Sequence, residues 1–121
     1  MAKFDALTIE PVWRKGRVIE GYDPNIIRKD ACGAWIVKDK YGDYDNLYGW
    51  EIDHIYPISL GGGNDIINLR PMNCSNNRSK GDDFPSYIAD VTSDGEKNVK
   101  KRKNLVVNEV LRNQLIEMYG K

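Results

Sequence analysis

The stretch that decides the fold is residues 49–82, which read GWEIDHIYPISLGGGNDIINLRPMNCSNNRSKGD. Residues 48–55 are rich in β-forming side chains, and Pro57 closes this run because proline suits the end of a strand rather than its centre. The glycine-rich run at residues 61–65 predicts a loop. Residues 68–72 then form a second short extended segment, so the pattern predicts two short strands joined by a loop.

A short polar helix is expected directly after the second strand, at residues 74–80. Ser75 lies near its N-cap, and Gly81 ends it as the first residue beyond the helix. We therefore predict an α+β fold whose centre is a short two-stranded hairpin plus a helix, with flanking strands and a C-terminal helix.

The N-terminal region, residues 1–31, contains four residues that break long elements: Pro11, Gly16, Gly21 and Pro24. We expect short strands or an irregular segment here, with one helical turn after Pro24. Residues 34–41 are rich in β-forming side chains and predict a further strand.

The C-terminal third predicts two more extended stretches and a helix. Residues 87–92 indicate a strand and residues 93–95 its turn, while residues 105–107 form the second stretch. Asn108 caps a helix that runs to about Tyr119. Its apolar positions recur at helical spacing, which is typical of core packing: Val110, Leu111, Leu115, Met118 and Tyr119.

Composition bounds the class of protein. The chain has 121 residues, which predicts a single domain over residues 1–121, and its formal net charge is zero. A neutral chain does not coat nucleic acid by bulk charge, but residues 97–121 hold seven basic and two acidic side chains. No apolar run long enough to span a membrane and no secretory signal pattern is visible, so a cytoplasmic location is expected.

The residues that carry chemistry centre on His54, the single histidine, with Asp53 directly before it. Hydrolysis of a phosphodiester needs a base that deprotonates water, a cation that neutralises charge on the phosphate, and groups that align the two. His54 suits the base, because an unperturbed imidazole is largely neutral at physiological pH. Asp53 and an Asn amide oxygen are hard ligands that suit Mg²⁺ or Mn²⁺.

One geometric condition applies to this pair. On a flat strand, the side chains of Asp53 and His54 point to opposite faces. Both serve one site only if the strand bends or ends there, and Pro57 with the glycine loop makes such an ending plausible.

The same stretch resembles the signature of the HNH nuclease family, which reads D-H-x-x-P, a Gly-Gly loop, N-L, and N-x-x-K-G. The matching residues in this chain are Asp53-His54-Ile55-Tyr56-Pro57, Gly61-Gly62, Asn68-Leu69 and Asn77-Arg78-Ser79-Lys80-Gly81. The resemblance covers residues 12–83, with its signature core at residues 49–82, and it is similar to that of small stand-alone bacterial and phage HNH proteins. It implies a ββα-metal core.

The resemblance also implies a role for each matched position. Asp53 ligates the metal, His54 is the general base, and Asn68 braces the loop that orients this base. Asn77 stands at the third signature position as a metal ligand, where a histidine often occurs, so the chain is an H-N-N variant. The neighbouring Asn76 is a rival for this place.

Three basic residues near the signature are candidate phosphate contacts: Lys80, Arg78 and Arg70. Each is equally well explained as a plain surface charge.

No structural zinc is expected. Many HNH proteins carry two C-x-x-C pairs around the motif, whereas this chain has only Cys32 and Cys74, which we interpret as free thiols. The fold must then be held by ordinary packing, with Trp35, Trp50 and Leu69 as candidates.

The leading hypothesis is a DNA endonuclease that depends on Mg²⁺ or Mn²⁺ and nicks DNA or cuts both strands. The alternative is a non-catalytic or partner-dependent nucleic-acid-binding HNH module, and a toxin nuclease is a third. RNA stays open as a substrate, because the motif engages the phosphate backbone. No helix-turn-helix or zinc finger is recognisable, so specificity is expected to be low or supplied by a protein partner, and a homodimer is one way to cut both strands.

Overall fold

The computed structural model describes residues 4–120, and in this range it contains three α-helices and three two-stranded antiparallel sheets. The helices are α1 (Ala6–Trp13), α2 (Cys74–Lys80) and α3 (Glu109–Tyr119). The sheets pair β1 (Ile27–Lys29) with β2 (Trp35–Val37), β3 (Trp50–His54) with β4 (Leu69–Asn73), and β5 (Ser86–Asp94) with β6 (Lys97–Val106). Short 3₁₀ turns lie at Lys38–Lys40, Ile58–Leu60 and Ile66–Asn68. The predicted α+β class is confirmed.

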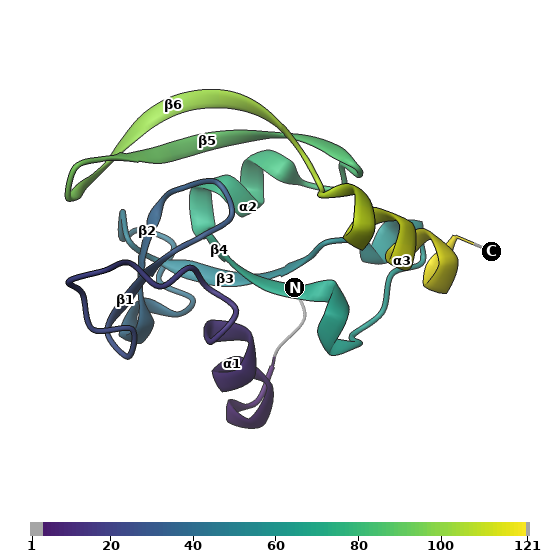
Figure 1. Cartoon of the computed structure of the whole chain (residues 1–121), viewed down its shortest axis with the longest axis horizontal. Helices are drawn as coiled ribbons and strands as arrows, with labels where there is room; N and C mark the ends of the chain where they lie inside the picture. Colours follow the sequence, from purple (N-terminus) through teal and green to yellow (C-terminus); the bar gives the residue numbers. More distant parts are fainter. Residues whose placement is uncertain (1–3, 121) are drawn as a thin grey trace.

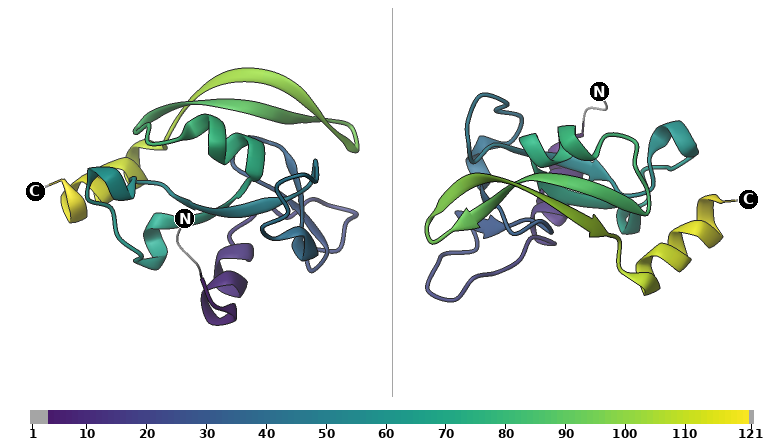
Figure 2. Two further views of the ribbon diagram at one scale, coloured as in Figure 1. Left: turned by 180° about the vertical axis from the view of Figure 1, so that it is seen from behind. Right: turned by 90° about the horizontal axis from the view of Figure 1, so that it is seen from above.

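The elements stack in layers (Figure 1). The β5–β6 hairpin arches over α2, α2 lies over the β3–β4 pair, and α1 lies on the far side of that pair. The views in Figure 2 show the same order and place α3 at one end of the molecule, beyond the end of the hairpin.

The centre of the fold follows the predicted order of strand, loop, strand and helix. β3 pairs with β4 in antiparallel register, with Asp53 opposite Arg70 and His54 opposite Leu69. The N-cap of α2 is Asn73 rather than Ser75, because the Asn73 side chain accepts from the backbone N–H groups of Ser75 and Asn76. Gly81 ends the helix as predicted, at a positive φ of 53° that favours glycine.

The N-terminal region differs from the prediction. Residues 6–13 form a helix despite Pro11. The single turn expected after Pro24 is present, closed by hydrogen bonds from the N–H groups of Ile26 and Ile27 to the Asp23 carbonyl, and β1 begins directly after it. Asp5 caps α1 by accepting from the backbone N–H of Thr8. The reason is tertiary: α1 buries Val12 and Trp13 completely, which outweighs the hydrogen bond that proline removes.

The C-terminal third contains more strand than the sequence pattern predicted. β6 covers Lys97–Val106 rather than residues 105–107, because its polar residues pair with β5 and mostly face solvent. Asn108 caps α3 as predicted. The predicted apolar stripe of α3 is only partly correct: Leu115 is fully buried, while Val110 is 70% exposed and Met118 46% exposed.

Two hydrophobic clusters hold the layers together. The first joins the loop after β3, β4, β5 and α3 through buried residues that include Ile55, Met72, Tyr87 and Leu115. The second joins α1 to β3 and β4 through Trp13, Trp50, Ile52 and Leu69. Trp35, Trp50 and Leu69 are buried as predicted. Within residues 4–120, none of the helices has the length and apolar character needed to cross a membrane.

Candidate active site at the end of β3

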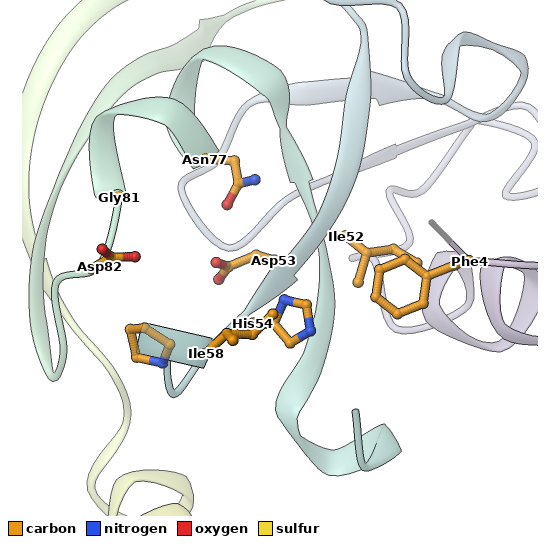
Figure 3. A pocket seen from close by; sticks show the side chains of 9 residues that line it. Phe4, Ile52, Asp53, His54, Ile58, Asn77, Gly81 and Asp82 are labelled. Carbon is orange, nitrogen blue, oxygen red and sulfur yellow. The ribbon is translucent and has the colours of Figure 1, made fainter. Parts of the chain in front are cut away.

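A pocket of about 250 Å³ lies where β3 ends and α2 approaches it (Figure 3). Its lining comes from the N-terminal segment, β3, the following loop and the C-terminal end of α2: Phe4, Ile52, Asp53, His54, Pro57, Ile58, Asn77, Gly81 and Asp82. The structure therefore brings Asp53, His54 and Asn77 together around one cavity.

Asp53 and His54 reach the same pocket because β3 ends at His54. Figure 3 shows the Asp53 carboxylate on the side of the strand where Asn77 and Asp82 lie, whereas the His54 ring lies toward Phe4. The centroids of the Phe4 and His54 rings are 5.7 Å apart. Successive side chains of a strand point to opposite faces, and because β3 ends at His54, the side chains of Asp53 and His54 can both line one pocket.

The imidazole of His54 is held by the loop that follows β3. Its Nε2 atom lies 2.7 Å from the amide oxygen of Asn64. An amide oxygen only accepts hydrogen bonds, so Nε2 carries the proton in neutral His54 and Nδ1 keeps its lone pair.

Asn68 fixes the shape of that loop. It is fully buried, its amide oxygen accepts from the backbone N–H of Tyr56 at 2.7 Å, and its amide nitrogen donates to the carbonyls of Tyr56 and Gly63. These contacts tie the two ends of the loop together, next to His54.

Asp53 is buried between two cations. Its side chain is 3% exposed, with Oδ2 2.9 Å from Nε of Arg70 and Oδ1 3.2 Å from Nζ of Lys80. Burial lowers the pKa of Lys80, and the charge of Asp53 opposes that effect. The carboxylate is thus charge-compensated in the absence of any other cation.

The three candidate phosphate contacts have different environments. Lys80 is not a surface charge: its side chain is 0% exposed, and its ammonium also donates to the backbone carbonyl of His54. Arg70 is largely covered and binds Asp53. Arg78 alone is exposed. The sequence pattern could not show that Lys80 points inward, because its direction depends on how α2 packs against β3.

Asn77 faces the pocket from α2, and Glu51 holds its side chain. The amide nitrogen of Asn77 donates to Oε1 of Glu51 at 2.9 Å. A carboxylate only accepts, so the amide oxygen of Asn77 remains available toward the cavity. Glu51 is 7% exposed. The pKa of Tyr44 is raised first by burial of its own hydroxyl and then by the negative charge of Glu51.

Asn76 has a different environment from Asn77. It is fully buried; its oxygen accepts from the backbone N–H groups of Asp90 and Val91, and its nitrogen donates to Asp30 and to the Val91 carbonyl. All of its hydrogen-bonding capacity is directed away from the pocket, into the packing of α2 against β5.

Three polar residues near the site were missed by sequence reasoning: Glu51, Asn64 and Asp82. Glu51 had a usable signal, because it lies two residues before Asp53 and so on the same face of the strand. Asn64 and Asp82 lie in irregular segments, where no periodicity shows which way a side chain points.

The side chains around the pocket suit a hard divalent cation that takes only some of its ligands from the protein. Among residues 4–120, no cluster of three or more His, Cys, Asp or Glu side chains is close enough to hold a metal ion alone. Asp53 and Asn77 offer one carboxylate and one amide oxygen, which are ligands that Mg²⁺ and Mn²⁺ accept alongside water and phosphate oxygens. Both cysteines are buried and free.

Comparison with known protein families identifies the segment that forms most of this pocket. A model of the HNH endonuclease family matches residues 42–86, which include β3, the glycine-rich loop, β4 and α2. This segment therefore belongs to the HNH endonuclease family, as the sequence resemblance predicted. No curated protein and no solved structure matches the chain.

Proposed function

We propose that this protein is a metal-dependent endonuclease that hydrolyses phosphodiester bonds of DNA, and that β3, β4 and α2 form its ββα-metal core. The observation that carries the proposal is the convergence of Asp53, His54 and Asn77 on one pocket at the end of β3. Residues 1–121 act as a single nuclease domain, and the enzyme works in the cytoplasm.

His54 acts as the general base. With Nε2 hydrogen-bonded to Asn64, the Nδ1 lone pair takes a proton from water as the water attacks phosphorus. The bond from phosphorus to the leaving oxygen breaks, and that oxygen takes a proton from solvent. Asn68 keeps the loop, and with it Asn64, in place. The imidazolium that forms is stabilised by the Asn64 amide oxygen, which continues to accept from Nε2–H.

Asp53 and Asn77 are the metal ligands, and Mg²⁺ or Mn²⁺ is the expected ion. When bound, such an ion neutralises charge on the phosphate and on the leaving oxygen. Lys80 and Arg70 neutralise the Asp53 carboxylate in the free protein, and Glu51 keeps the Asn77 amide oxygen directed to the pocket. Arg78, which is exposed, is the best placed of the three candidates to contact a phosphate.

A second candidate is a non-catalytic or partner-dependent nucleic-acid-binding module. The observation that favours it is that both oxygens of Asp53 are paired with cations, Arg70 and Lys80, so a metal must compete with an existing ion pair. A homodimer or a protein that supplies specificity fits either candidate, and RNA is the competing nucleic acid.

The deciding experiment is conversion of supercoiled plasmid by the purified protein in Mg²⁺, in Mn²⁺ and in EDTA. We expect open-circular or linear DNA with metal only, and a loss of at least about 100-fold in rate for His54→Ala, since general-base catalysis contributes roughly that much. Circular dichroism of the variant controls for folding. An equal rate in His54→Ala would remove His54 as the base, and no conversion with either metal would favour the binding module.

A further inference from the structure

A second, smaller pocket of about 200 Å³ lies beside β4 and shares no residue with the candidate active site. Four basic side chains line it, Lys15, Arg17, Lys29 and Arg70, and Asp30 is the only acidic one among its lining residues. The lining of this pocket is therefore basic, although the formal net charge of the chain is zero.

The single acid forms no ion pair with any of these cations in the described part of the chain. Asp30 is 1% exposed, and its Oδ1 accepts from the backbone N–H groups of Cys32 and Ala34. Its Oδ2 accepts from Asn73 and Asn76. Asp30 therefore organises the protein interior, and the pocket keeps an excess of positive charge.

Backbone pairing holds two of the cations side by side. Arg17 and Lys29 form an antiparallel bridge in which each N–H donates to the other's carbonyl, at 2.8 and 3.0 Å. Side chains directly opposite in such a pair lie on the same face, and like charges there repel. Arg28 fixes the backbone turn that leads to Arg17, because its guanidinium donates to the carbonyls of Arg14 and Gly16.

The other two cations, Lys15 and Arg70, lie close enough for their charges to interact, and only Arg70 has an ion-pair partner among the described residues. The ammonium of Lys15 donates to the carbonyls of Ile66 and Leu69, and its pKa is lowered by burial and by the positive charge of Arg70. Arg70 binds Asp53 through Nε and its guanidinium lies over the Tyr87 ring, 5.1 Å from the ring centroid, while its Nη2 is buried without a hydrogen bond among the described residues. Buried donors without a partner are rare in folded proteins.

We propose that this basic pocket binds a phosphate group of the nucleic-acid backbone, next to the one that is cleaved. Of the four cations that line the pocket, only Arg70 has a carboxylate partner among the described residues, Asp53, while the Lys29 ammonium lies 4.5 Å from the centroid of the Trp35 ring. A phosphate offers several acceptor oxygens and negative charge to such a lining, and arginine is well suited to bind it. The choice of nucleic acid as the source rests on the proposed function. Arg70 links the two sites, since it lines this pocket and holds Asp53 of the first one.

The first test uses inorganic phosphate alone, so it does not depend on cleavage. Titration of the full chain, followed by amide NMR shifts, should perturb residues 15–17 and 29–31 most strongly, and Arg17→Glu should abolish these shifts. Retained backbone shifts elsewhere in the spectrum show that the variant folds. Shifts confined to other regions, or shifts that persist in Arg17→Glu, would overturn the proposal.

The second test asks whether the phosphate belongs to nucleic acid. The affinity of His54→Ala for a DNA duplex is measured in EDTA at several salt concentrations, with and without Arg17→Ala. Each phosphate contact contributes about 0.9 to the slope of log affinity against log salt, so we expect Arg17→Ala to reduce the slope by about that amount. Arg102→Ala, an exposed arginine on β6, is the matched control and should not reduce it.

The outcomes separate this inference from the proposed nuclease. An unchanged slope in Arg17→Ala, or equal losses in Arg17→Ala and Arg102→Ala, would overturn a backbone-phosphate site, even if inorganic phosphate binds. A reduced slope confined to Arg17→Ala would support it even if the plasmid assay showed no cleavage.

Discussion

At the scale of single residues, a charged neighbour decides which atom of Asn77 faces the candidate active site. Asn77 can present either its amide oxygen or its amide nitrogen to the pocket, and only the oxygen binds a metal. Glu51 removes the ambiguity by accepting from the nitrogen at 2.9 Å. Partners behind a metal ligand commonly change metal affinity when they are removed, even though they never touch the ion.

A pair of substitutions tests this role. We expect Glu51→Ala to raise the concentration of Mg²⁺ or Mn²⁺ needed for half-maximal plasmid cleavage by roughly 10- to 100-fold, because Asn77 is then free to turn. Glu51→Gln keeps an acceptor oxygen and should retain most of the activity. The metal dependence of each variant is compared, with circular dichroism as the folding control. Equal losses in both variants would mean that the charge of Glu51 matters and the hydrogen bond does not.

At the scale of elements, side-chain contacts with the β5–β6 hairpin stabilise α2, and its intrinsic helix propensity does not suffice. It has seven residues, too few for a helix that is stable alone, and it packs against both β3 and β5. Asn76 bonds the backbone of β5 beside an irregularity between Ala89 and Val91, so its amide replaces the regular ladder there. The position of Asn77 and Lys80 therefore depends on Asn76.

Removal of this amide should be costly for stability. We expect Asn76→Ala to lower the free energy of unfolding by about 3 kcal/mol, because several buried groups of Asp30, Asp90 and Val91 lose their partner. The control is Ser79→Ala, which removes one hydrogen bond from α2 to Ile88 and should cost about 1 kcal/mol. Urea unfolding measures both. Equal losses would show that Asn76 has no special role in joining these elements.

At the scale of the whole molecule, two hydrophobic clusters and a network of buried polar groups hold the layers together. The clusters lie on the two sides of the β3–β4 pair, one towards α3 and β5 and the other towards α1. Both cysteines are free thiols, as predicted, and both are buried. Burial, reinforced by Asp30 for Cys32 and by Glu51 for Cys74, raises the pKa of each thiol to about 12.

These thiols should report on unfolding of the whole chain. Because the thiolate is the reactive form, a pKa of about 12 leaves almost none of it at pH 8, and burial blocks access as well. We expect negligible labelling by a disulfide reagent in the native protein and labelling of both cysteines in urea, with a midpoint that matches loss of circular dichroism. Fast labelling of the native protein would show that one cysteine lies in a region that opens locally.

The sequence predicted those parts of the protein that local chemistry controls. Proline and glycine residues correctly indicated where β3 ends and where the loop lies. Gly81 indicated the end of α2, and Asn108 indicated the start of α3. Each of these residues acts through its own backbone or its immediate neighbours, so its effect can be predicted locally. The spacing of Asp53, His54, Asn68 and Asn77 identified the family segment for the same reason: a motif within about 30 residues is fixed by short connections.

Tertiary structure alone decided the features that depend on which surfaces meet. α1 forms in spite of Pro11 because Val12 and Trp13 are buried against distant strands, and β6 is long because β5 supplies its partners. Lys80 turns inward because Asp53 lies opposite it. Asn76 and Asn77 have different environments because α2 directs Asn76 toward β5 and Asn77 toward Glu51 and the pocket. The basic pocket is built from three segments that are separate in the sequence, residues 15–17, 29–31 and 70–71. Tertiary packing brings their charges together, and the periodicity of the sequence cannot predict such packing.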